Sequence, residues 1–141
     1  MNFRLDPRLL ADTTFIGELP LSRLLLMNDA RFPWLILVPR IAGARELTDL
    51  DATDQASLLA ELVQVGRVLE DLLHPVKLNI AALGNTVAQL HVHVIARFSN
   101  DAAWPRPVWG CGEPVPYAAE ALGLRLGALR SALRGVMDRA R

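Results

Sequence analysis

The sequence contains little cysteine and has no excess of charge. Cys111 is the only cysteine in 141 residues, which excludes an internal disulfide and suits a reducing compartment. Fifteen lysines and arginines balance fifteen aspartates and glutamates, so no overall field attracts nucleic acid or an anionic membrane. We therefore expect a cytoplasmic protein that binds neither nucleic acid nor membranes, and any phosphate recognition must be local.

Long apolar runs are also absent. No stretch approaches the roughly 18 apolar residues that span a bilayer. Charge and proline occupy the first seven residues, where a signal peptide would have its apolar core. What is present is a 52% apolar composition, which is enough to bury a real core. Without internal repeats or low-complexity tracts, the chain is expected to form a single domain over residues 1–141.

The pattern of apolar residues predicts strands and two helices. Strands are predicted at 15–18, 21–27, 34–38, 77–83 and 90–98. Apolar residues spaced by three and four predict one amphipathic helix from Asp51 to Pro75 and a second from about residue 117. Residues 99–116, rich in proline, glycine and tryptophan, should form an ordered loop. This order indicates an α+β fold with a five-stranded, mainly antiparallel sheet.

The most informative segment is residues 89–95, Gln-Leu-His-Val-His-Val-Ile. Because side chains alternate between the faces of a strand, this segment has one apolar face and one polar face. The polar face carries Gln89, His91 and His93. A strand with a purely structural role has little use for two imidazoles on one face, so we expect a functional site here.

Three chemistries fit a His-X-His strand. A zinc site needs three or four protein ligands, and the only other histidine, His74, sits at a predicted helix end where a structural or solvated role suits it better. A serine or cysteine nucleophile needs a recognisable elbow, which neither Cys111 nor any serine provides. The third chemistry uses histidine itself as a nucleophile that attacks phosphorus. We favour this one and expect no metal.

The loop before the histidines fits the same chemistry. Charge on the oxygens of a transferred phosphoryl group must be met by preorganised donors. Gly84 permits close approach of the backbone, while Asn85 and Thr86 offer side-chain donors. An ordinary hairpin turn is the alternative interpretation of these three residues.

The residues as a set resemble a known family. The segment Gln89-Leu-His91-Val-His93-Val94-Ile95 is similar to the histidine triad motif, His-φ-His-φ-His-φ-φ with φ apolar, of the histidine triad (HIT) nucleotide hydrolases and transferases. The resemblance extends to Leu-Met-Asn28, Trp34-Leu-Ile-Leu-Val-Pro39, Asn79 before the motif and a Trp-Pro element beyond it. The chain looks most like a bacterial branch described as diadenosine-polyphosphate hydrolase-like, in which glutamine occupies the first triad position.

The resemblance implies a fold and an activity. It implies a five-stranded antiparallel sheet with two helices, a homodimer, no cofactor, and cleavage of a nucleoside phosphate or dinucleoside polyphosphate at the α-phosphorus. By position, His91 matches the family's nucleophile, which forms a covalent nucleotidyl-histidine intermediate. His93 matches the third triad histidine, which orients or neutralises the phosphate.

The resemblance also implies substrate contacts. Asn28 matches a residue that holds ribose hydroxyls, and Phe15 and Ile16 lie where the base packs. The expected phosphate-binding residues are Asn79, Gly84, Asn85 and Thr86. Trp104 could close over a bound ligand, whereas Trp109 is interpreted as structural, and this exposed tryptophan pair also favours a homodimer.

Gln89 departs from the triad pattern. In the family, the first triad position offers its main-chain carbonyl to the nucleophile's other ring nitrogen, and glutamine keeps that carbonyl. A titratable group is lost, which leaves a non-catalytic nucleotide-binding regulatory or scaffold protein as the alternative function. Arg97 shares the histidine side of the strand, where it could bind phosphate, although a solvated arginine at a strand end is the commoner outcome.

Overall fold

The computed structural model describes residues 2–138. Five strands form one sheet, namely β1 (Thr13–Glu18), β2 (Ser22–Met27), β3 (Trp34–Pro39), β4 (Lys77–Ala81) and β5 (Val92–Arg97). Their order is β1-β2-β3-β5-β4, and every neighbouring pair is antiparallel. The predicted α+β class with a five-stranded antiparallel sheet is confirmed.

The long helix α2 (Ala52–Leu73) begins and ends at the expected signals. The carboxylate of Asp51 accepts a hydrogen bond from the main-chain N–H of Asp54 at 2.8 Å, as an N-cap residue does. His74 ends the helix in the left-handed conformation, with φ of 52°, and Pro75 follows. His74 is therefore an exposed helix cap.

Shorter helices lie at the two ends of the described chain. α1 (Pro7–Asp12) was not among the predicted elements, although Asp6 caps it through the main-chain N–H of Arg8 and proline occupies its first position, both common start signals. A 3₁₀ turn, η1, spans Leu47–Asp49. The C-terminal helix starts slightly later than predicted, as α3 (Ala119–Ala132), and is followed by α4 (Arg134–Met137).

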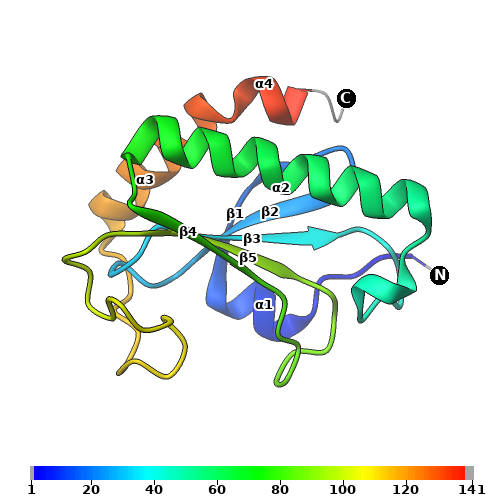
Figure 1. Cartoon of the computed structure of the whole chain (residues 1–141), viewed down its shortest axis with the longest axis horizontal. Coiled ribbons are helices and arrows are strands. Elements are labelled where there is room, and N and C mark those ends of the chain that lie inside the picture. The colour runs from blue at the N-terminus through cyan, green and yellow to red at the C-terminus, as the bar shows by residue number, and fades with distance from the viewer. Residues whose placement is uncertain (1, 139–141) are drawn as a thin grey trace.

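Figure 1 shows α2 on one side of the sheet and α1 on the other, and an apolar core lies on each side. On one face, α2 and α3 pack over a core that includes Leu35, Val65, Val94 and Leu129. On the other face, α1 and the loop after β5 cover a second core, which includes Leu9, Trp34, Ile36, Ile95 and Val108. Among residues 2–138, no helix is long and apolar enough to cross a membrane.

The predicted alternation of β5 decides which layer holds the histidines. Val92 and Val94 belong to the core beneath α2, whereas Ile95 belongs to the opposite core. His91, His93 and Arg97 alternate with the valines, so they lie on the same side as Ile95. We call this side of the sheet, which α1 and the loop after β5 cover, the histidine face.

Candidate functional site

His91 stands immediately before β5 with its imidazole 6% exposed. Its Nδ1 lies 2.6 Å from the main-chain oxygen of Gln89. A carbonyl oxygen can only accept a hydrogen bond, so Nδ1 must carry the proton and donate. In the neutral ring the lone pair is then on Nε2, and this is the nitrogen available for nucleophilic attack.

His93 carries its proton on the other nitrogen. The indole Nε1–H of Trp34 donates to Nδ1 of His93 at 2.9 Å. Because an indole N–H can only donate, Nδ1 of His93 must be unprotonated, which leaves the proton on Nε2. Burial, together with a smaller effect of the nearby His91, lowers the pKa of His93 to about 4. His93 is therefore a neutral ring whose Nε2–H can donate.

Aromatic rings enclose His93. The centroids of the His91 and His93 rings are 5.0 Å apart, and Trp109 meets His93 edge-on at 5.1 Å. Trp34 in turn meets Trp109 at 5.8 Å. Trp109 and Trp34 thus fix the plane of the His93 ring, and the loop after β5 becomes part of the site.

The two Nε2 atoms are the open positions of the pair. Within residues 2–138, neither atom has a recorded hydrogen bond. The buried side-chain atoms that lack a partner in the same residues are Ser22 Oγ, Glu61 Oε1 and Tyr117 Oη. Because neither Nε2 atom is among them, both reach the surface of the site. One open position is a lone pair and the other is an N–H.

Gln89 uses its main chain and its side chain for different purposes. Its main-chain oxygen contacts His91, whereas its carboxamide bridges the N-terminal segment, accepting from the N–H of Asp6 at 2.9 Å and donating to the oxygen of Arg4 at 2.7 Å. The glutamine side chain therefore holds residues 4–6 beside His91. It makes no recorded hydrogen bond to either histidine within the described chain.

The loop before the histidines reaches the same place. Gly84 adopts φ of 80°, a conformation that L side chains rarely adopt. Together with His91 and Gln89, it lines a small cavity. Asn85 and Thr86 are exposed next to it, and the main-chain oxygen of Thr86 accepts from Arg8 at 2.7 Å. The structure thus brings Gly84 to His91, with Asn85 and Thr86 at the rim.

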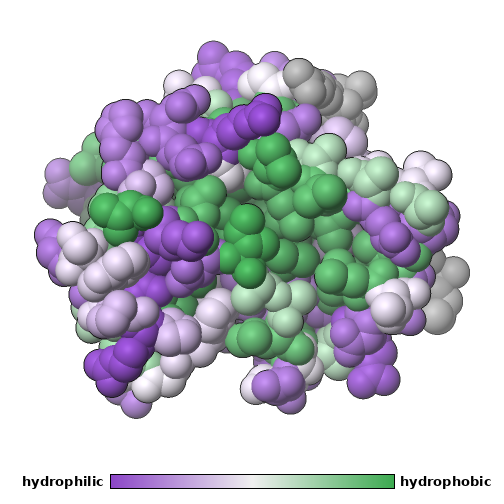
Figure 2. Space-filling model, in the orientation of Figure 1, coloured by the Kyte–Doolittle hydropathy of each residue, from purple (hydrophilic) through white to green (hydrophobic). Residues whose placement is uncertain are grey.

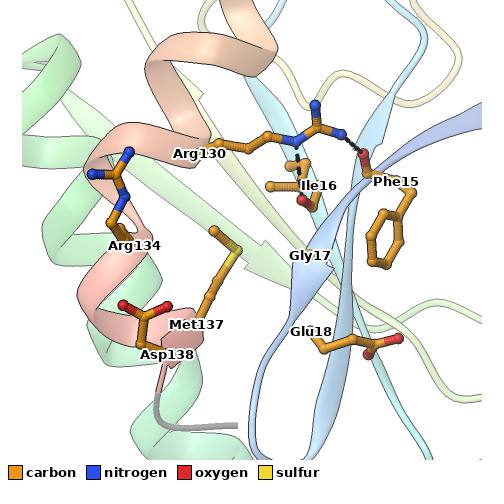
Figure 3. A pocket seen from close by; sticks show the side chains of 8 residues that line it. All are labelled: Phe15, Ile16, Gly17, Glu18, Arg130, Arg134, Met137 and Asp138. Carbon is orange, nitrogen blue, oxygen red and sulfur yellow. Dashed lines mark hydrogen bonds between the residues drawn. The ribbon is translucent and has the colours of Figure 1, made fainter. Parts of the chain in front are cut away.

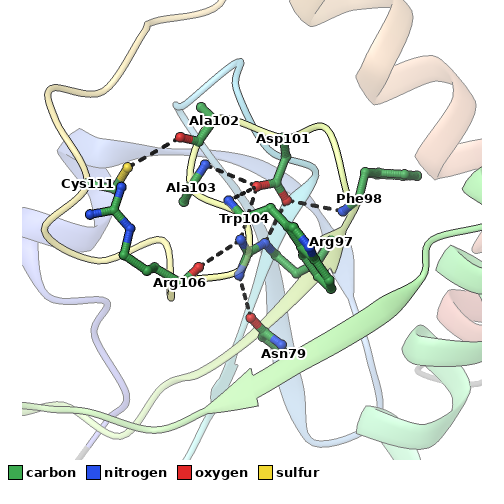
Figure 4. Close-up of polar contacts among 9 residues, drawn as sticks. All are labelled: Asn79, Arg97, Phe98, Asp101, Ala102, Ala103, Trp104, Arg106 and Cys111. Atoms are coloured by element: carbon green, nitrogen blue, oxygen red, sulfur yellow. Dashed lines mark hydrogen bonds and ion pairs between the residues drawn. The ribbon is translucent and has the colours of Figure 1, made fainter.

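The structure contradicts both interpretations of Arg97, as a phosphate-binding residue and as a solvated residue. Its side chain is 1% exposed and pairs with Asp101 through two bonds of 2.7 and 3.0 Å. It also donates to Asn79 and to the main-chain oxygen of Arg106. As Figure 4 shows, these bonds join β4, β5 and the following loop. Arg97 is neither free for phosphate nor solvated, because the loop folds back over it.

Asp101 completes this anchor, and two predicted site residues belong to it. Burial alone would raise the pKa of Asp101, but hydrogen bonds from Arg97 and from main-chain amides of the loop hold it well below its usual range. The side-chain oxygen of Asn79 is occupied by Arg97 at 2.7 Å. Trp104 covers the Arg97 guanidinium at 5.6 Å and remains 38% exposed. Trp104 is thus attached to the loop anchor.

Asn28 follows the last residue of β2, whereas His91 precedes the first residue of β5. Because β2 and β5 run in the same direction on either side of β3, the two residues lie at opposite ends of their strands. The side-chain oxygen of Asn28 accepts from the N–H of Tyr117 at 2.9 Å. The side-chain NH₂ of Asn28 is the group left to donate to a ligand.

The two residues expected at the base are separated by the sheet. Phe15 pairs with Leu25, Leu25 with Ile36, and Ile36 with His93, which forms one row across four strands. Phe15 is 47% exposed and shares this row with His93. Ile16 is 3% exposed and its side chain belongs to the core beneath α2, so of the two side chains only that of Phe15 lies on the histidine face.

A pocket of about 750 Å³ lies at the other edge of the sheet (Figure 3). It lies between β1 and the C-terminal helices, where Arg130 donates to the main-chain oxygens of Phe15 and Ile16 at 2.7 and 3.1 Å. Gly17 and Glu18 of β1 and Arg134, Met137 and Asp138 of the C-terminal region line the remainder. No histidine, serine or cysteine lines this pocket, so it is separate from the histidine pair.

The zinc alternative finds no support in the described residues. In residues 2–138, no group of three or more His, Cys, Asp or Glu could hold a metal ion. His74 caps α2 at the end that leads into β4, whereas His91 lies where β5 begins. Because β4 and β5 are antiparallel, the two histidines are at opposite ends of the sheet.

Sequence reasoning missed three contributors to the site. Trp34 was predicted only as part of a buried strand, and its indole N–H gave no signal of its own. Trp109 was interpreted as structural. Asp6 and its neighbours reach Gln89 across 83 positions of sequence, a distance that no local pattern reveals.

Fold and site together define a class of protein. It is a small α+β protein in which an inner strand of an antiparallel sheet presents a His-X-His pair, with opposite nitrogens of the two rings held by fixed partners. The HIT domain model matches residues 8–100, which is more than half of the chain. The chain belongs to the HIT domain family.

Solved structures agree with this assignment. A histidine triad protein from Bradyrhizobium japonicum is 50% identical, with a TM-score of 0.91 over 94% of this chain and 98% of its own. One from Marinobacter aquaeolei VT8 is 44% identical, with a TM-score of 0.93 over 96% and 99%. One from Sinorhizobium meliloti 1021 is 46% identical, with a TM-score of 0.90 over 93% and 97%. A search of curated proteins gave no match.

Proposed function

We propose that this protein is a nucleotide hydrolase or transferase that cleaves a nucleoside phosphate or dinucleoside polyphosphate at the α-phosphorus through a covalent nucleotidyl-His91 intermediate. The observation that carries the proposal is the 2.6 Å contact between Nδ1 of His91 and the main-chain oxygen of Gln89. This contact leaves the Nε2 lone pair of His91 free and gives the positive ring that forms on attack a carbonyl partner.

The covalent step conserves atoms and charge. Nε2 of His91 forms a bond to the α-phosphorus while the bond from phosphorus to the leaving-group oxygen breaks, and that oxygen departs with the electron pair. The His91 ring is then positive, with Nδ1–H still bonded to the Gln89 oxygen. Water next attacks phosphorus, releases neutral His91, and loses a proton to solvent. For a transferase, another acceptor hydroxyl replaces water.

Neighbouring donors support the charge that develops on phosphorus. The Nε2–H of His93 can donate to a phosphoryl oxygen, because its ring centroid is 5.0 Å from that of His91. Main-chain amides of the loop at Gly84, Asn85 and Thr86 are the other proposed donors, because Gly84 lines a cavity with His91. Asn79 is an indirect contributor in this proposal, since its side-chain oxygen is bonded to Arg97.

The nucleoside is proposed to lie along the histidine face. Phe15 shares a strand row with His93 and offers an apolar surface to the base. The free NH₂ of Asn28 could donate to a ribose hydroxyl. Trp104, half-exposed over Arg97, could close on the ligand from the loop side.

We also propose that two copies associate through β4, which is an edge strand. Gly66 of α2 faces Leu78 of β4, so Leu59 and Val63, at helical spacing from Gly66, share its side of the helix. They are 64% and 42% exposed, and Ile80, on the same face of β4 as Leu78, is 49% exposed. Figure 2 displays apolar side chains gathered on this side. An unpaired strand beside an apolar surface favours a symmetric homodimer.

A non-catalytic nucleotide-binding protein is the second candidate, and burial is the observation that favours it. His91 and His93 are only 6% and 4% exposed, and the carboxamide of Gln89 holds the N-terminal segment beside them. If that segment does not move, a nucleotide could bind at the rim without reaching His91. We place either activity in the cytoplasm, on the basis of the single cysteine.

Trapping the intermediate distinguishes the two candidates. Wild-type protein is mixed with a nucleotide donor, quenched within one turnover and examined by intact-mass spectrometry and peptide mapping. A nucleotidyl adduct on His91 is expected. His91→Ala should give no adduct yet retain nucleotide binding, because ground-state contacts remain. His74→Asn is the matched control, since asparagine tolerates the left-handed conformation, and it should form the adduct normally. An adduct-free wild type that still binds nucleotide would favour the non-catalytic candidate.

A further inference from the structure

Trp34 determines which nitrogen of His93 can hold a proton, and this has a consequence for the substrate. We infer that the site cleaves nucleotidyl compounds whose leaving group departs as a stable anion, a phosphate or a carboxylate, because the Trp34 N–H keeps His93 as a neutral donor that cannot protonate a poorer leaving group. The inference rests on the proposed attack by His91. It assigns Trp34 as a positioning residue.

The geometry at Nδ1 forbids the charged ring. Trp34 Nε1 and His93 Nδ1 are 2.9 Å apart. A second proton on the His93 ring would have to sit on Nδ1, where it would face the indole hydrogen across this distance. Neither group could then accept, so one hydrogen bond would be replaced by a repulsive contact between two donors in a buried place.

The surroundings of His93 offer nothing that would favour a positive charge. His91 faces it from the residue just before β5, Trp34 from β3 and Trp109 from the loop. Ile36 and Ala81 are its partners on the neighbouring strands. Arg97, on the same face of β5, is paired with Asp101. A positive His91 would repel a positive His93, and no carboxylate in the described residues forms an ion pair with His93.

A neutral imidazole N–H is a hydrogen-bond donor but a very weak acid. When His91 attacks, the proton on Nε2 of His93 can stabilise a departing oxygen by a hydrogen bond, but giving that proton away would leave an imidazolate. The leaving group must therefore carry the electron pair away alone. A terminal phosphate of a nucleotide or a carboxylate does this readily, whereas an amine or an alkoxide requires a proton in the transition state.

The test compares substrates that share the adenylyl group. Diadenosine triphosphate releases ADP, a mixed anhydride of AMP with acetate releases a carboxylate, and adenosine phosphoramidate must release an amine. Because a positioned general acid contributes about 10²–10⁴-fold, its absence predicts that kcat/KM for the phosphoramidate is at least about 100-fold below that for the two anhydrides. A series of adenosine aryl phosphates should show a steep dependence of kcat/KM on the acidity of the phenol.

Two matched variants test Trp34 itself. Trp34→Phe keeps an aromatic ring but removes the N–H, which frees Nδ1 of His93 to take up a proton. The aryl-phosphate dependence should become shallower, and the phosphoramidate should gain at least tenfold relative to diadenosine triphosphate. Trp109→Phe changes a second indole that packs against the same ring but makes no recorded hydrogen bond to it within residues 2–138. The substrate ratio of this variant should stay within about threefold of the wild type, whatever happens to its absolute rate.

The outcomes separate this inference from the proposed function. Preference for the phosphoramidate in wild type, with an adduct on His91, would overturn the inference and leave the proposed function intact. An unchanged ratio and slope in Trp34→Phe would overturn the role of Trp34. If none of the compounds were cleaved and no adduct formed, both would fail. The ¹⁵N shifts of the His93 ring in wild type and Trp34→Phe give a readout that does not depend on turnover: Nδ1 should be unprotonated in the former and share the proton in the latter, and a protonated Nδ1 in wild type would overturn the inference.

Discussion

Buried polar side chains at the two ends of the histidine face of β5 differ in how completely they are hydrogen-bonded. At Arg97, the guanidinium nitrogens are occupied by Asp101, Asn79 and a main-chain oxygen. At His91 and His93, one nitrogen of each ring is held and the other reaches the surface. A side chain whose hydrogen-bonding groups are all satisfied stabilises the fold, whereas a ring with one unbonded nitrogen keeps that nitrogen available to a substrate. The same strand face therefore contains an anchor and a reactive pair.

The largest effect is expected when the free lone pair is removed. His91→Ala should reduce kcat to below roughly 10⁻⁴ of wild type, because removal of a nucleophile leaves only binding and electrostatic contributions. Nucleotide affinity should change little, because the ground-state contacts remain. Stopped-assay turnover and calorimetric titration with AMP measure these quantities. Turnover at the wild-type rate would show that His91 is not the nucleophile.

Removing the Arg97–Asp101 pair should lower the stability of the fold and leave the catalytic step itself unchanged. Arg97→Met leaves Asp101 buried without its partner, and the loss of one member of a buried pair costs about 3–5 kcal/mol of unfolding free energy. Arg23 is the matched control, because its single bond to Glu18 is about one-third exposed at both ends, and Arg23→Met should cost less than about 1 kcal/mol. Urea denaturation measures both variants. Equal costs would remove the distinction between the anchor and a surface pair.

Acid should remove the stability contributed by His93 and by Asp101 in different pH ranges. The pKa of His93 is lowered from 6.5 to about 4, so the unfolded chain binds this proton more readily than the folded one. The stability contributed is complete above pH 6.5 and falls by about 3 kcal/mol as the pH drops to about 4, at 1.36 kcal/mol per unit. Asp101 also has a lowered pKa, but its loss begins only below its ordinary value of 3.8. Between roughly pH 7 and pH 4, the unfolding free energy of the wild type should therefore fall by about 3 kcal/mol relative to that of His93→Phe, which has no titrating ring at this position. Parallel curves would contradict the lowered pKa.

The smallest effect is expected at Gln89. Its main-chain oxygen holds His91, and this atom survives in Gln89→Ala, so kcat/KM should fall by less than about tenfold. Loss of the two side-chain hydrogen bonds to residues 4–6 should lower the unfolding free energy by about 1–2 kcal/mol. Gln89→His restores a titratable ring and should shift the pH dependence of the rate. If Gln89→Ala were as inactive as His91→Ala, the side chain would take part directly.

The sequence predicted the face of β5 but not the partners on that face. The two-residue period of a strand assigned His91 and His93 to one side and Val92 and Val94 to the other, and pairing with β3 agrees. The tautomer of His93 depends on Trp34, which pairs with Ile95 and reaches His93 only in three dimensions. Hydrophobic periodicity records that a residue is buried, and it does not record where an indole N–H points.

The other departures have a similar cause. Arg97 is buried because residues 98–106 fold back over it, which a loop rich in proline and glycine does not disclose. The side chain of Ile16 lies on the opposite side of the sheet from that of Phe15 because neighbouring strand residues alternate, so the two side chains do not form one apolar surface. α1 carried local signals in Asp6 and Pro7, and six residues are too few for a periodic pattern.

The central claim is that His91 and His93 carry their protons on opposite nitrogens, and ¹⁵N NMR of selectively labelled histidine tests it most directly. At neutral pH, the ring of His91 should have a protonated Nδ1 and an unprotonated Nε2, and the ring of His93 should have the reverse. Assignment follows from His91→Ala and His93→Phe, each of which removes one set of signals. If both rings had the same tautomer, or if His93 were doubly protonated, the division between a nucleophile and a neutral donor would be contradicted.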